Sequence, residues 1–172
     1  FKATSLPVVV ARPFNTFGPR QSLRAVIPTI ISQFVSINKK QNQIKVGNLN
    51  TSRDFVYVND TVTGLISLLK PKCKTGEIYN ICTGKSHKIR DVIQVLKKIT
   101  KYNPKIIISK KRFRKAEVFN LRGSNKKLFF STKWKPKYVN NNGFAKALTE
   151  TYAWFSEENN LSKYSNIDKY NI

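Results

Sequence analysis

The residues best suited to chemistry in this sequence are polar side chains placed where predicted strands begin or end. The stretch VVVARPFNTFGPRQS, residues 8–22, starts as an apolar strand and breaks into a loop that holds Arg12, Asn15 and Arg20. Arg53 opens a second strand in RDFVYV. A guanidinium can form two parallel hydrogen bonds to a phosphate. From spacing alone two interpretations stay open: an anion site, or a structural role in which Asn15 caps a turn and Arg12 pairs with a surface acid.

Strands and helices alternate around these residues, which predicts an α/β fold that is parallel at least at its start. The apolar run at 6–11 is typical of a parallel strand covered on both faces. We expect further strands at 44–46, 55–58, 76–84 and 105–109, and helices at 26–37, 62–69, 89–99, 125–130 and 143–158. Ligands of such sheets bind beyond the carboxyl ends of the strands, where the first loop is expected to lie.

Length and composition favour one folded domain of 172 residues with 40% hydrophobic content. No apolar run approaches the roughly 20 residues of a membrane span, so no membrane partner is expected. Cys73 and Cys82 have no His or acidic neighbours at metal-ligand spacing, which favours a reducing, cytoplasmic location and no metal site. Because the sequence starts at Phe1, has no Met and enters a strand within five residues, we expect a fragment of a longer protein.

The net charge of +23 allows a second function, the binding of nucleic acid through phosphate neutralisation. The block from Lys97 to Lys115 holds nine basic residues and no acidic one. Against this, the basic residues are 24 Lys and only 8 Arg among abundant Asn and Ile, which is the composition that an AT-rich genome gives to any surface. We therefore expect compositional drift, and keep a non-enzymatic nucleic-acid-binding module as the alternative.

The order of the motifs resembles the carboxyl-terminal half of the NAD-dependent epimerase/dehydratase family, the extended short-chain dehydrogenases that act on nucleotide-diphosphate sugars. The motifs are, in order, ARPFNTFGPRQS, VIPTII, IKVGNLNTSRDFVYVNDTVTG, GEIYNICTG, RFRKAEV and KWKPK. Within the family they look most similar to 4,6-dehydratases of nucleotide-linked N-acetylglucosamine. The resemblance implies the carboxyl-terminal part of a Rossmann-like parallel sheet plus a small α/β substrate-binding lobe over residues 1–158, followed by a polar tail at 159–172.

Two parts of the family's machinery are missing from this sequence. No two of the seven glycines lie two positions apart, so the glycine-rich loop that holds the cofactor pyrophosphate is absent. None of the seven tyrosines has a Lys four residues later, so the catalytic Tyr/Lys pair is absent and no catalytic residue is assigned. We therefore expect NAD to be held mainly by a missing amino-terminal half, either upstream or on a separate chain, and this chain to be inactive alone.

The resemblance also assigns binding residues. Pro13 and Phe14 would lie against the nicotinamide of NAD, while a nucleotide-diphosphate sugar would contact Asn15, Arg20, Val26, Ile27, Pro28, Ile44, Lys45, Val46, Arg53 and Arg112. Within that set, Asn15, Arg53 and Arg112 would bind the diphosphate, 26–28 would cover the nucleotide base, and 44–46 would line the same pocket through backbone groups. Arg114 is the alternative to Arg112 if the register differs by two, because Phe113 stands where the family has Pro.

The remaining candidates are expected to be structural. Asp54 should orient backbone groups or Arg53 rather than transfer protons, and Asp60 should cap a helix. His87 has no acid or nucleophile near it in sequence, and Cys82 has the size of a buried filler. Trp134 and Trp154 could stack on nucleic-acid bases, but we expect them to pack the carboxyl-terminal part of the chain.

Overall fold

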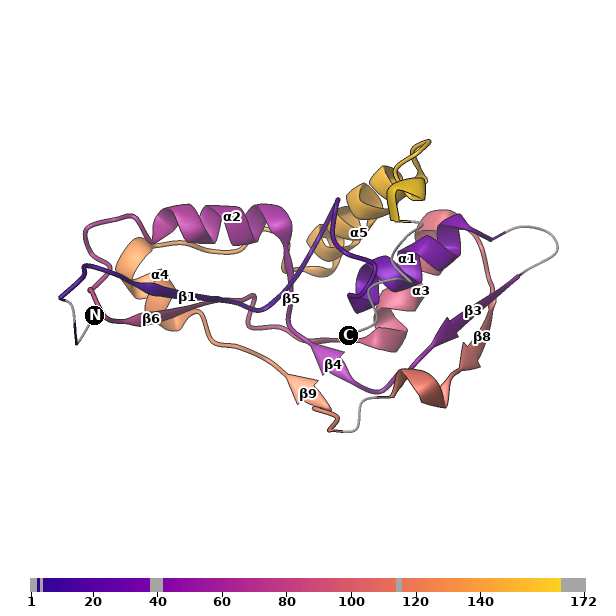
Figure 1. The fold of residues 1–172 in the computed structure, drawn as a ribbon, viewed down its shortest axis with the longest axis horizontal. Coiled ribbons are helices and arrows are strands. Elements are labelled where there is room, and N and C mark those ends of the chain that lie inside the picture. The colour runs from indigo at the N-terminus through magenta and orange to yellow at the C-terminus, as the bar shows by residue number, and fades with distance from the viewer. Residues whose placement is uncertain (1–2, 4, 38–41, 114–115, 165–172) are drawn as a thin grey trace. The chain divides into compact units, whose positions relative to one another are not determined.

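The computed structural model describes residues 3, 5–37, 42–113 and 116–164, and these residues form two compact units. The first unit comprises Phe1–Thr16, Ser52–His87 and Asn120–Phe144; the second comprises Phe17–Thr51, Lys88–Phe119 and Ala145–Ile172. Arg114 and residues 165–172 of the predicted tail lie outside the described residues. Each unit is an α/β structure with parallel strands, as predicted (Figure 1).

The first unit is built on strands β1 (Val10–Pro13) and β6 (Ile78–Ile81), which pair in parallel from Val10–Ile78 to Pro13–Ile81. Helix α2 (Val58–Ser67) and helix α4 (Lys126–Thr132) pack against β6 (Figure 1). The buried core consists of Val56, Leu68, Tyr79, Ile81, Leu128 and Trp134. Trp134 therefore packs this unit, and its Nε1–H donates to Thr63 Oγ1 at 3.1 Å.

Three further strand pairings involve short strands that bring distant parts of the chain together. Strand β2 (Asn15–Phe17) pairs with β5 (Phe55–Tyr57). Strand β4 (Ser52–Arg53) lies between β7 (His87–Lys88) and β9 (Asn120–Leu121), with Ser52 opposite Asn120 and Arg53 opposite Leu121. These strands place Arg53 and Asn15 within the same part of the first unit.

The second unit contains strands β3 (Gln43–Val46) and β8 (Lys105–Ile108), which pair in parallel. Helices α1 (Val26–Val35) and α3 (Ile89–Thr100) pack on each other, and α1 also packs on β3. The helix predicted at 89–99 is confirmed as α3, and it buries one apolar face with Ile89, Val92, Ile93 and Leu96. The 3₁₀ helices η1 (Lys110–Arg112) and η2 (Ser162–Tyr164) complete this unit. Helix α5 (Asn141–Ser156) is assigned to the first unit up to Phe144 and to the second from Ala145.

The first predicted strand differs from the observed one in position and burial. Strand β1 begins at Val10 rather than residue 6, because its pairing with β6 starts at Ile78. Leu6 is 58% exposed and Val10 is 45% exposed, so the expected cover on both faces is not found among the described residues. Apolar strands of parallel sheets are normally covered on both faces.

Helix α2 starts four residues before the predicted position, and the assignment of Asp60 as its cap is wrong. Tyr57, with an extended backbone, occupies the N-cap position, and Asp60 lies in the first turn. The buried Asp60 carboxylate instead accepts hydrogen bonds from the backbone N–H groups of Lys137 and Tyr138, both at 2.9 Å. Asp60 thus fastens the 137–138 turn to the start of the helix.

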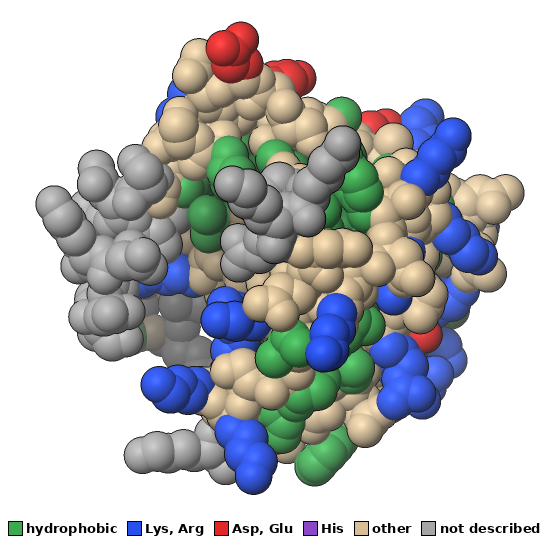
Figure 2. Space-filling model, turned by 90° about the vertical axis from the view of Figure 1, so that its right-hand side faces the viewer, with side chains coloured by type: hydrophobic (Ala, Val, Ile, Leu, Met, Phe, Trp, Pro, Cys, Tyr) green, Lys and Arg blue, Asp and Glu red, His purple; other side chains and the backbone are tan. Residues whose placement is uncertain are grey.

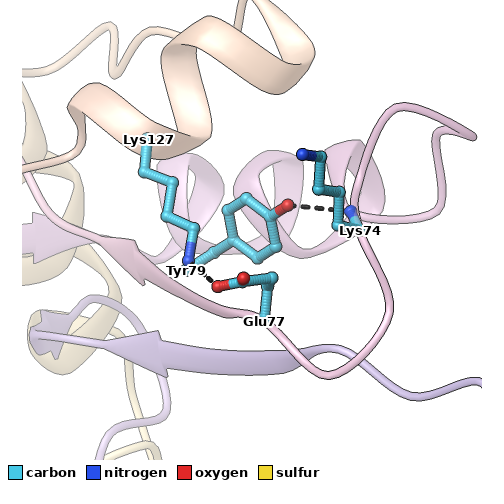
Figure 3. Close-up of polar contacts among 4 residues, drawn as sticks. All are labelled: Lys74, Glu77, Tyr79 and Lys127. Carbon is cyan, nitrogen blue, oxygen red and sulfur yellow. Dashed lines mark hydrogen bonds and ion pairs between the residues drawn. The ribbon is translucent and has the colours of Figure 1, made fainter.

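A buried tyrosine joins the end of the α2–β6 connection to α4 (Figure 3). The backbone N–H of Lys74 donates to Tyr79 Oη at 2.9 Å, and Lys127 Nζ lies 4.9 Å from the centre of the Tyr79 ring. Lys127 also forms an ion pair with Glu77, and this ion pair lowers the pKa of Glu77. The tyrosine is 1% exposed, whereas both charged side chains are 47% exposed.

We predict that Tyr79→Phe destabilises the chain by about 1 kcal/mol, because the Lys74 N–H loses the acceptor that the buried tyrosine supplies. Glu77→Gln, the matched control, should change stability little, since exposed ion pairs contribute little. Because the fold lowers the pKa of Glu77, any stability that the Glu77–Lys127 ion pair contributes is present above the ordinary pKa of Glu77. This stability is lost as the pH falls through the lowered pKa. Urea unfolding of the two variants measures the difference, and equal midpoints would contradict this assignment.

Candidate functional site

The predicted site residues divide between the two units, and each group is described by itself. The first unit holds Pro13, Phe14, Asn15 and Arg53. The second holds Arg20, the 26–28 and 44–46 segments and Arg112.

Asp54 is the centre of the first group. This residue lies in the chain between the end of β4 and the start of β5, and its side chain is fully buried. Oδ1 accepts hydrogen bonds from the Thr83 N–H at 2.9 Å and the Thr83 hydroxyl at 2.6 Å, and Oδ2 accepts the N–H groups of Gly84 at 2.9 Å and Gly123 at 3.2 Å. As predicted, Asp54 orients backbone, and it joins three chain segments that are far apart in sequence.

The backbone of Asp54 also positions Asn15. Both the backbone N–H of Asn15, at 3.3 Å, and its side-chain Nδ2, at 3.1 Å, donate to the Asp54 carbonyl oxygen. Thr16 next to it shares a 3.0 Å hydrogen bond between hydroxyl groups with Thr61 of α2. The Asn15 amide is thus held by backbone, and its predicted contact with a diphosphate remains a prediction.

Arg53 immediately precedes Asp54 and is half-buried. Strand β4 pairs it with Leu121 of β9, and its Nη1 donates to the Ser52 carbonyl at 2.8 Å. The Ser52 hydroxyl in turn donates to Asn120 Oδ1 at 2.8 Å. Asn15 bonds to the backbone carbonyl of Asp54, and Arg53 is the residue before Asp54, so the structure places these two predicted phosphate ligands on either side of the Asp54 backbone.

Phe14 lies directly after β1 with its ring on the inside of the first unit. A Cβ atom at Gly123 would lie 2.6 Å from Phe14 Cζ and 2.6 Å from Cys82 Sγ, so this position accepts only glycine without a shift of its neighbours. The Phe14 N–H donates to the Ile81 carbonyl at 2.9 Å. The ring therefore packs on the core, and Pro13 beside it is exposed. Their contact with a nicotinamide remains a prediction.

Cys82 and His87 of the first unit lie in structural surroundings. His87 stacks on Phe144 with ring centroids 3.9 Å apart. Cys82 is buried, and desolvation, assisted by the nearby Asp54 charge, raises the pKa of its thiol to about 12. A thiol with such a pKa is a poor nucleophile near neutral pH.

We predict that a thiol reagent at pH 8 labels Cys73 and leaves Cys82 unmodified until the chain unfolds. Cys73 is half-buried and Cys82 is buried, and a pKa of about 12 leaves about one Cys82 in 10⁴ as thiolate at that pH. The fold raises the pKa of Cys82 because it favours the neutral thiol. The stability that this preference gives to the folded chain is fully present below the ordinary pKa of 9.0 and declines as the pH rises toward 12. The Cys73→Ser variant retains only Cys82, so its labelling rate is the rate of the Cys82 thiol. Fast labelling of this folded variant would contradict the prediction.

In the second unit most of the predicted base-contacting side chains belong to the core. Ile27 is 1% exposed, and Pro28, Ile44 and Val46 are also buried, while Val26 is 39% exposed. The buried side chains position α1 and β3, and of the apolar residues in this set only Val26 presents substantial surface. The predicted contact of 44–46 with a nucleotide through backbone groups remains a prediction.

The backbone of Lys45 is held by a residue that the sequence analysis missed. Gln33 Oε1 accepts the Lys45 N–H at 2.7 Å, and Gln33 Nε2 donates to the Lys45 carbonyl at 3.1 Å. Gln33 Nε2 also donates to the Thr29 carbonyl of α1 at 3.0 Å. This side chain therefore fixes the outer edge of β3 to α1 and occupies both polar backbone groups of Lys45. A glutamine late in a mostly apolar helix is the sequence signal for it.

The two arginines of the second unit that were predicted as ligands, Arg20 and Arg112, are exposed and lie in tight backbone turns. Arg20 has a left-handed backbone with φ of 65°. Arg112 lies in η1, where its carbonyl oxygen approaches Gly47 so closely that a Cβ there would lie 2.9 Å away. Asn48, next to Gly47, donates to Glu117 at 3.0 Å. The 47–48 turn therefore sets the position of Arg112.

The described residues hold no group of three or more His, Cys, Asp or Glu side chains that could bind a metal ion. Among the helices that the structure describes, none is long and apolar enough to cross a membrane.

Comparisons with known proteins confirm the family resemblance. Residues 1–147 match a family model described as GDP-mannose 4,6 dehydratase. The GDP-6-deoxy-D-mannose reductase of Pseudomonas aeruginosa is 36% identical over 132 residues, which are 76% of this chain and 43% of the reductase. Human dTDP-D-glucose 4,6-dehydratase is 28% identical over 171 residues, 95% of this chain and 45% of the dehydratase.

Solved structures confirm the Rossmann-like fold. RMD from Pseudomonas aeruginosa, complexed with NADPH, has a TM-score of 0.78 and 32% identity, covering 87% of this chain and 48% of that one. UDP-glucuronic acid 4-epimerase from Bacillus cereus, in complex with UDP-glucuronic acid and NAD, has a TM-score of 0.74 and 25% identity, covering 89% and 46%. This chain thus spans about half the length of the proteins that it matches.

Proposed function

Because the chain belongs to the GDP-mannose 4,6-dehydratase family of NAD-dependent epimerases and dehydratases, we propose that it is the part of such an enzyme that binds the nucleotide-diphosphate sugar. One observation supports the proposal: the Asn15 amide donates to the Asp54 backbone carbonyl at 3.1 Å and Arg53 directly precedes Asp54, so the two predicted phosphate ligands of the first unit are both held next to this buried residue. A fixed amide and a fixed guanidinium are suited to bind phosphate oxygens without a large loss of side-chain entropy. Arg20 and Arg112 are proposed as further ligands from the second unit.

The role proposed for this part is positioning. Holding the diphosphate fixes where the sugar lies, and fixed geometry is a large part of what such a site contributes to rate. In the whole enzyme NAD would supply hydride transfer at the sugar. This sequence has no glycine-rich pyrophosphate loop and no Tyr/Lys pair. We therefore propose that NAD is held mainly by an upstream or separate half, with Pro13 and Phe14 contributing, and that the chain alone is inactive.

Titration calorimetry of the chain with GDP, dTDP and UDP tests the proposal. We expect at least one of these nucleotides to bind, and to bind at least tenfold more tightly than its own monophosphate, because each lost phosphate removes charge-assisted hydrogen bonds. NAD should give no comparable heat. Equal affinity for the diphosphate and the unphosphorylated nucleoside, or tight binding of NAD alone, would contradict the proposal.

The alternative, a nucleic-acid-binding module, depends on the basic block. Lys98, Lys101, Lys105, Lys110 and Lys111 are all exposed. On one face of the molecule, Lys and Arg side chains border hydrophobic ones (Figure 2). A complex with duplex or single-stranded DNA that survives physiological salt would support the alternative. If the basic residues reflect only compositional drift, DNA should bind weakly and dissociate at that salt concentration.

A further inference from the structure

The outer side of helix α4 joins exposed aromatic surface to lysine side chains. Phe130 is 69% exposed, and the centroid of its ring lies 5.7 Å from that of the half-buried Phe129. Lys133 Nζ lies 5.3 Å from the centre of the Phe129 ring, and Lys135 Nζ lies 5.1 Å from it. The Phe129 ring therefore gathers two ammonium groups next to an exposed phenylalanine.

Two further lysines belong to the same surface. Lys70 Nζ donates to the carbonyl oxygen of Thr132, the last residue of α4, at 3.1 Å. Lys126 is exposed and precedes Phe130 by four residues, a spacing that places both residues on one face of the helix. We define the α4 patch as Lys70, Lys126, Phe129, Phe130, Lys133 and Lys135.

The carboxylates of the first unit are all engaged elsewhere. Its acidic residues are Asp54, Asp60 and Glu77. Asp54 and Asp60 are buried and accept hydrogen bonds from backbone N–H groups. Glu77 forms an ion pair with Lys127, which is not part of the α4 patch. The lysines of the patch therefore keep their positive charge without a carboxylate from their own unit, and the patch is suited to an anionic partner.

The residue types of the patch distinguish between classes of anionic partner. Protein interfaces favour Arg, whose planar fork matches a carboxylate, and are depleted in Lys. Stacking platforms for nucleic-acid bases need an open ring face, whereas two lysines already lie over the Phe129 ring. An anionic lipid bilayer, in contrast, attracts clusters of lysines and admits an exposed aromatic side chain at the level of its headgroups.

We propose that the α4 patch is a contact surface for an anionic lipid bilayer, with the Phe130 ring in the headgroup region and the lysines facing lipid phosphates. The expectation of no membrane partner was based on the lack of an apolar run long enough to span a bilayer, and a surface contact needs no such run. Because the attraction is mainly electrostatic, binding is reversible and weakens as salt is added. The proposal does not depend on nucleotide binding by the chain.

Co-sedimentation with lipid vesicles tests the proposal. The probes are vesicles of phosphatidylglycerol and phosphatidylcholine in equal parts, and vesicles of phosphatidylcholine alone. We expect the chain to sediment with the anionic vesicles and not with the neutral ones. Lys133→Gln combined with Lys135→Gln should lower the vesicle partition coefficient by about tenfold or more. Lys98→Gln combined with Lys101→Gln removes the same charge from exposed positions of the second unit and should have a much smaller effect.

Phe130 allows a second measurement that does not alter the charge. Phe130→Ser keeps every lysine and should still weaken binding severalfold, because the exposed aromatic surface no longer enters the bilayer. Phe130→Trp should bind anionic vesicles as the unaltered chain does. Its fluorescence emission should shift to shorter wavelength on binding, because the indole leaves water for the headgroup region.

The proposal would be overturned by equal sedimentation with anionic and neutral vesicles, by equal losses in the two double-lysine variants, or by an unshifted emission of vesicle-bound Phe130→Trp. A chain that ignores vesicles but binds DNA through Lys133 and Lys135 would also overturn it, and would assign the patch to nucleic acid. Circular dichroism establishes that each variant is folded. Nucleotide titration of the unaltered chain tests the proposed function separately, so that the failure of one proposal leaves the other intact.

Discussion

Replacing Asp54 by alanine is expected to destabilise the chain by about 4 kcal/mol or more, enough to leave much of it unfolded. The carboxylate accepts four hydrogen bonds, from Thr83, Gly84 and Gly123, in a fully buried position. Hydrogen bonds to charged groups contribute about 1.5–3 kcal/mol each, and each buried N–H left without an acceptor adds a desolvation cost. Urea unfolding followed by circular dichroism measures the change.

Asp54→Asn is the matched control. Its amide oxygen can keep the two bonds from Thr83, but its NH₂ group then faces the donors of Gly84 and Gly123. We expect an intermediate loss of stability. If Asp54→Ala unfolds at the wild-type urea concentration, Asp54 does not hold these segments together.

Arg53→Ala is expected to reduce the affinity for a nucleoside diphosphate by about ten- to a hundredfold, since it would remove the proposed charge-assisted, bidentate contact to phosphate, worth about 1.5–3 kcal/mol. Arg53→Lys should restore only part of the affinity, because an ammonium cannot reproduce the planar fork. In a reconstituted enzyme most of the loss should appear in KM, because the diphosphate is remote from the reacting carbon.

His87→Ala provides the control for Arg53. His87 stacks on Phe144 at 3.9 Å, so its removal should lower stability and leave nucleotide affinity unchanged. Calorimetry with the nucleotide that binds the unaltered chain measures both variants. Wild-type affinity in Arg53→Ala together with lost affinity in His87→Ala would show that the diphosphate site is assigned wrongly.

The alternation of apolar runs and turn residues was sufficient to predict the α/β class and the long elements. Helix α3 follows from its apolar period, since Ile89, Val92, Ile93 and Leu96 face one side. The start of α2 could not be predicted in this way, because Asp60 bonds to Lys137 and Tyr138, 77 and 78 residues away, instead of capping its own helix. The two-residue strands β4 and β9 likewise depend on partners distant in sequence.

The structure confirms the orienting role predicted for Asp54, whereas the binding of a diphosphate by Asn15 and Arg53 stays a prediction. The partners of Asp54 are separated from it by 29 to 69 residues, so no local spacing predicts them. Gln33 was missed for the same reason, because its two bonds to Lys45 become evident only once β3 lies beside α1.

Backbone amide NMR of the isotopically labelled chain during titration with GDP, dTDP or UDP shows whether the diphosphate binds at Asn15 and Arg53. We expect saturable shifts at Asn15, Arg53 and the Asp54-bonded Gly84 and Gly123 when the nucleotide that binds is added, and weaker shifts with its nucleoside. Shifts confined to the exposed lysines between 97 and 111, or the absence of any saturable shift with all three nucleotides, would contradict the claim that this chain binds the diphosphate of a nucleotide sugar.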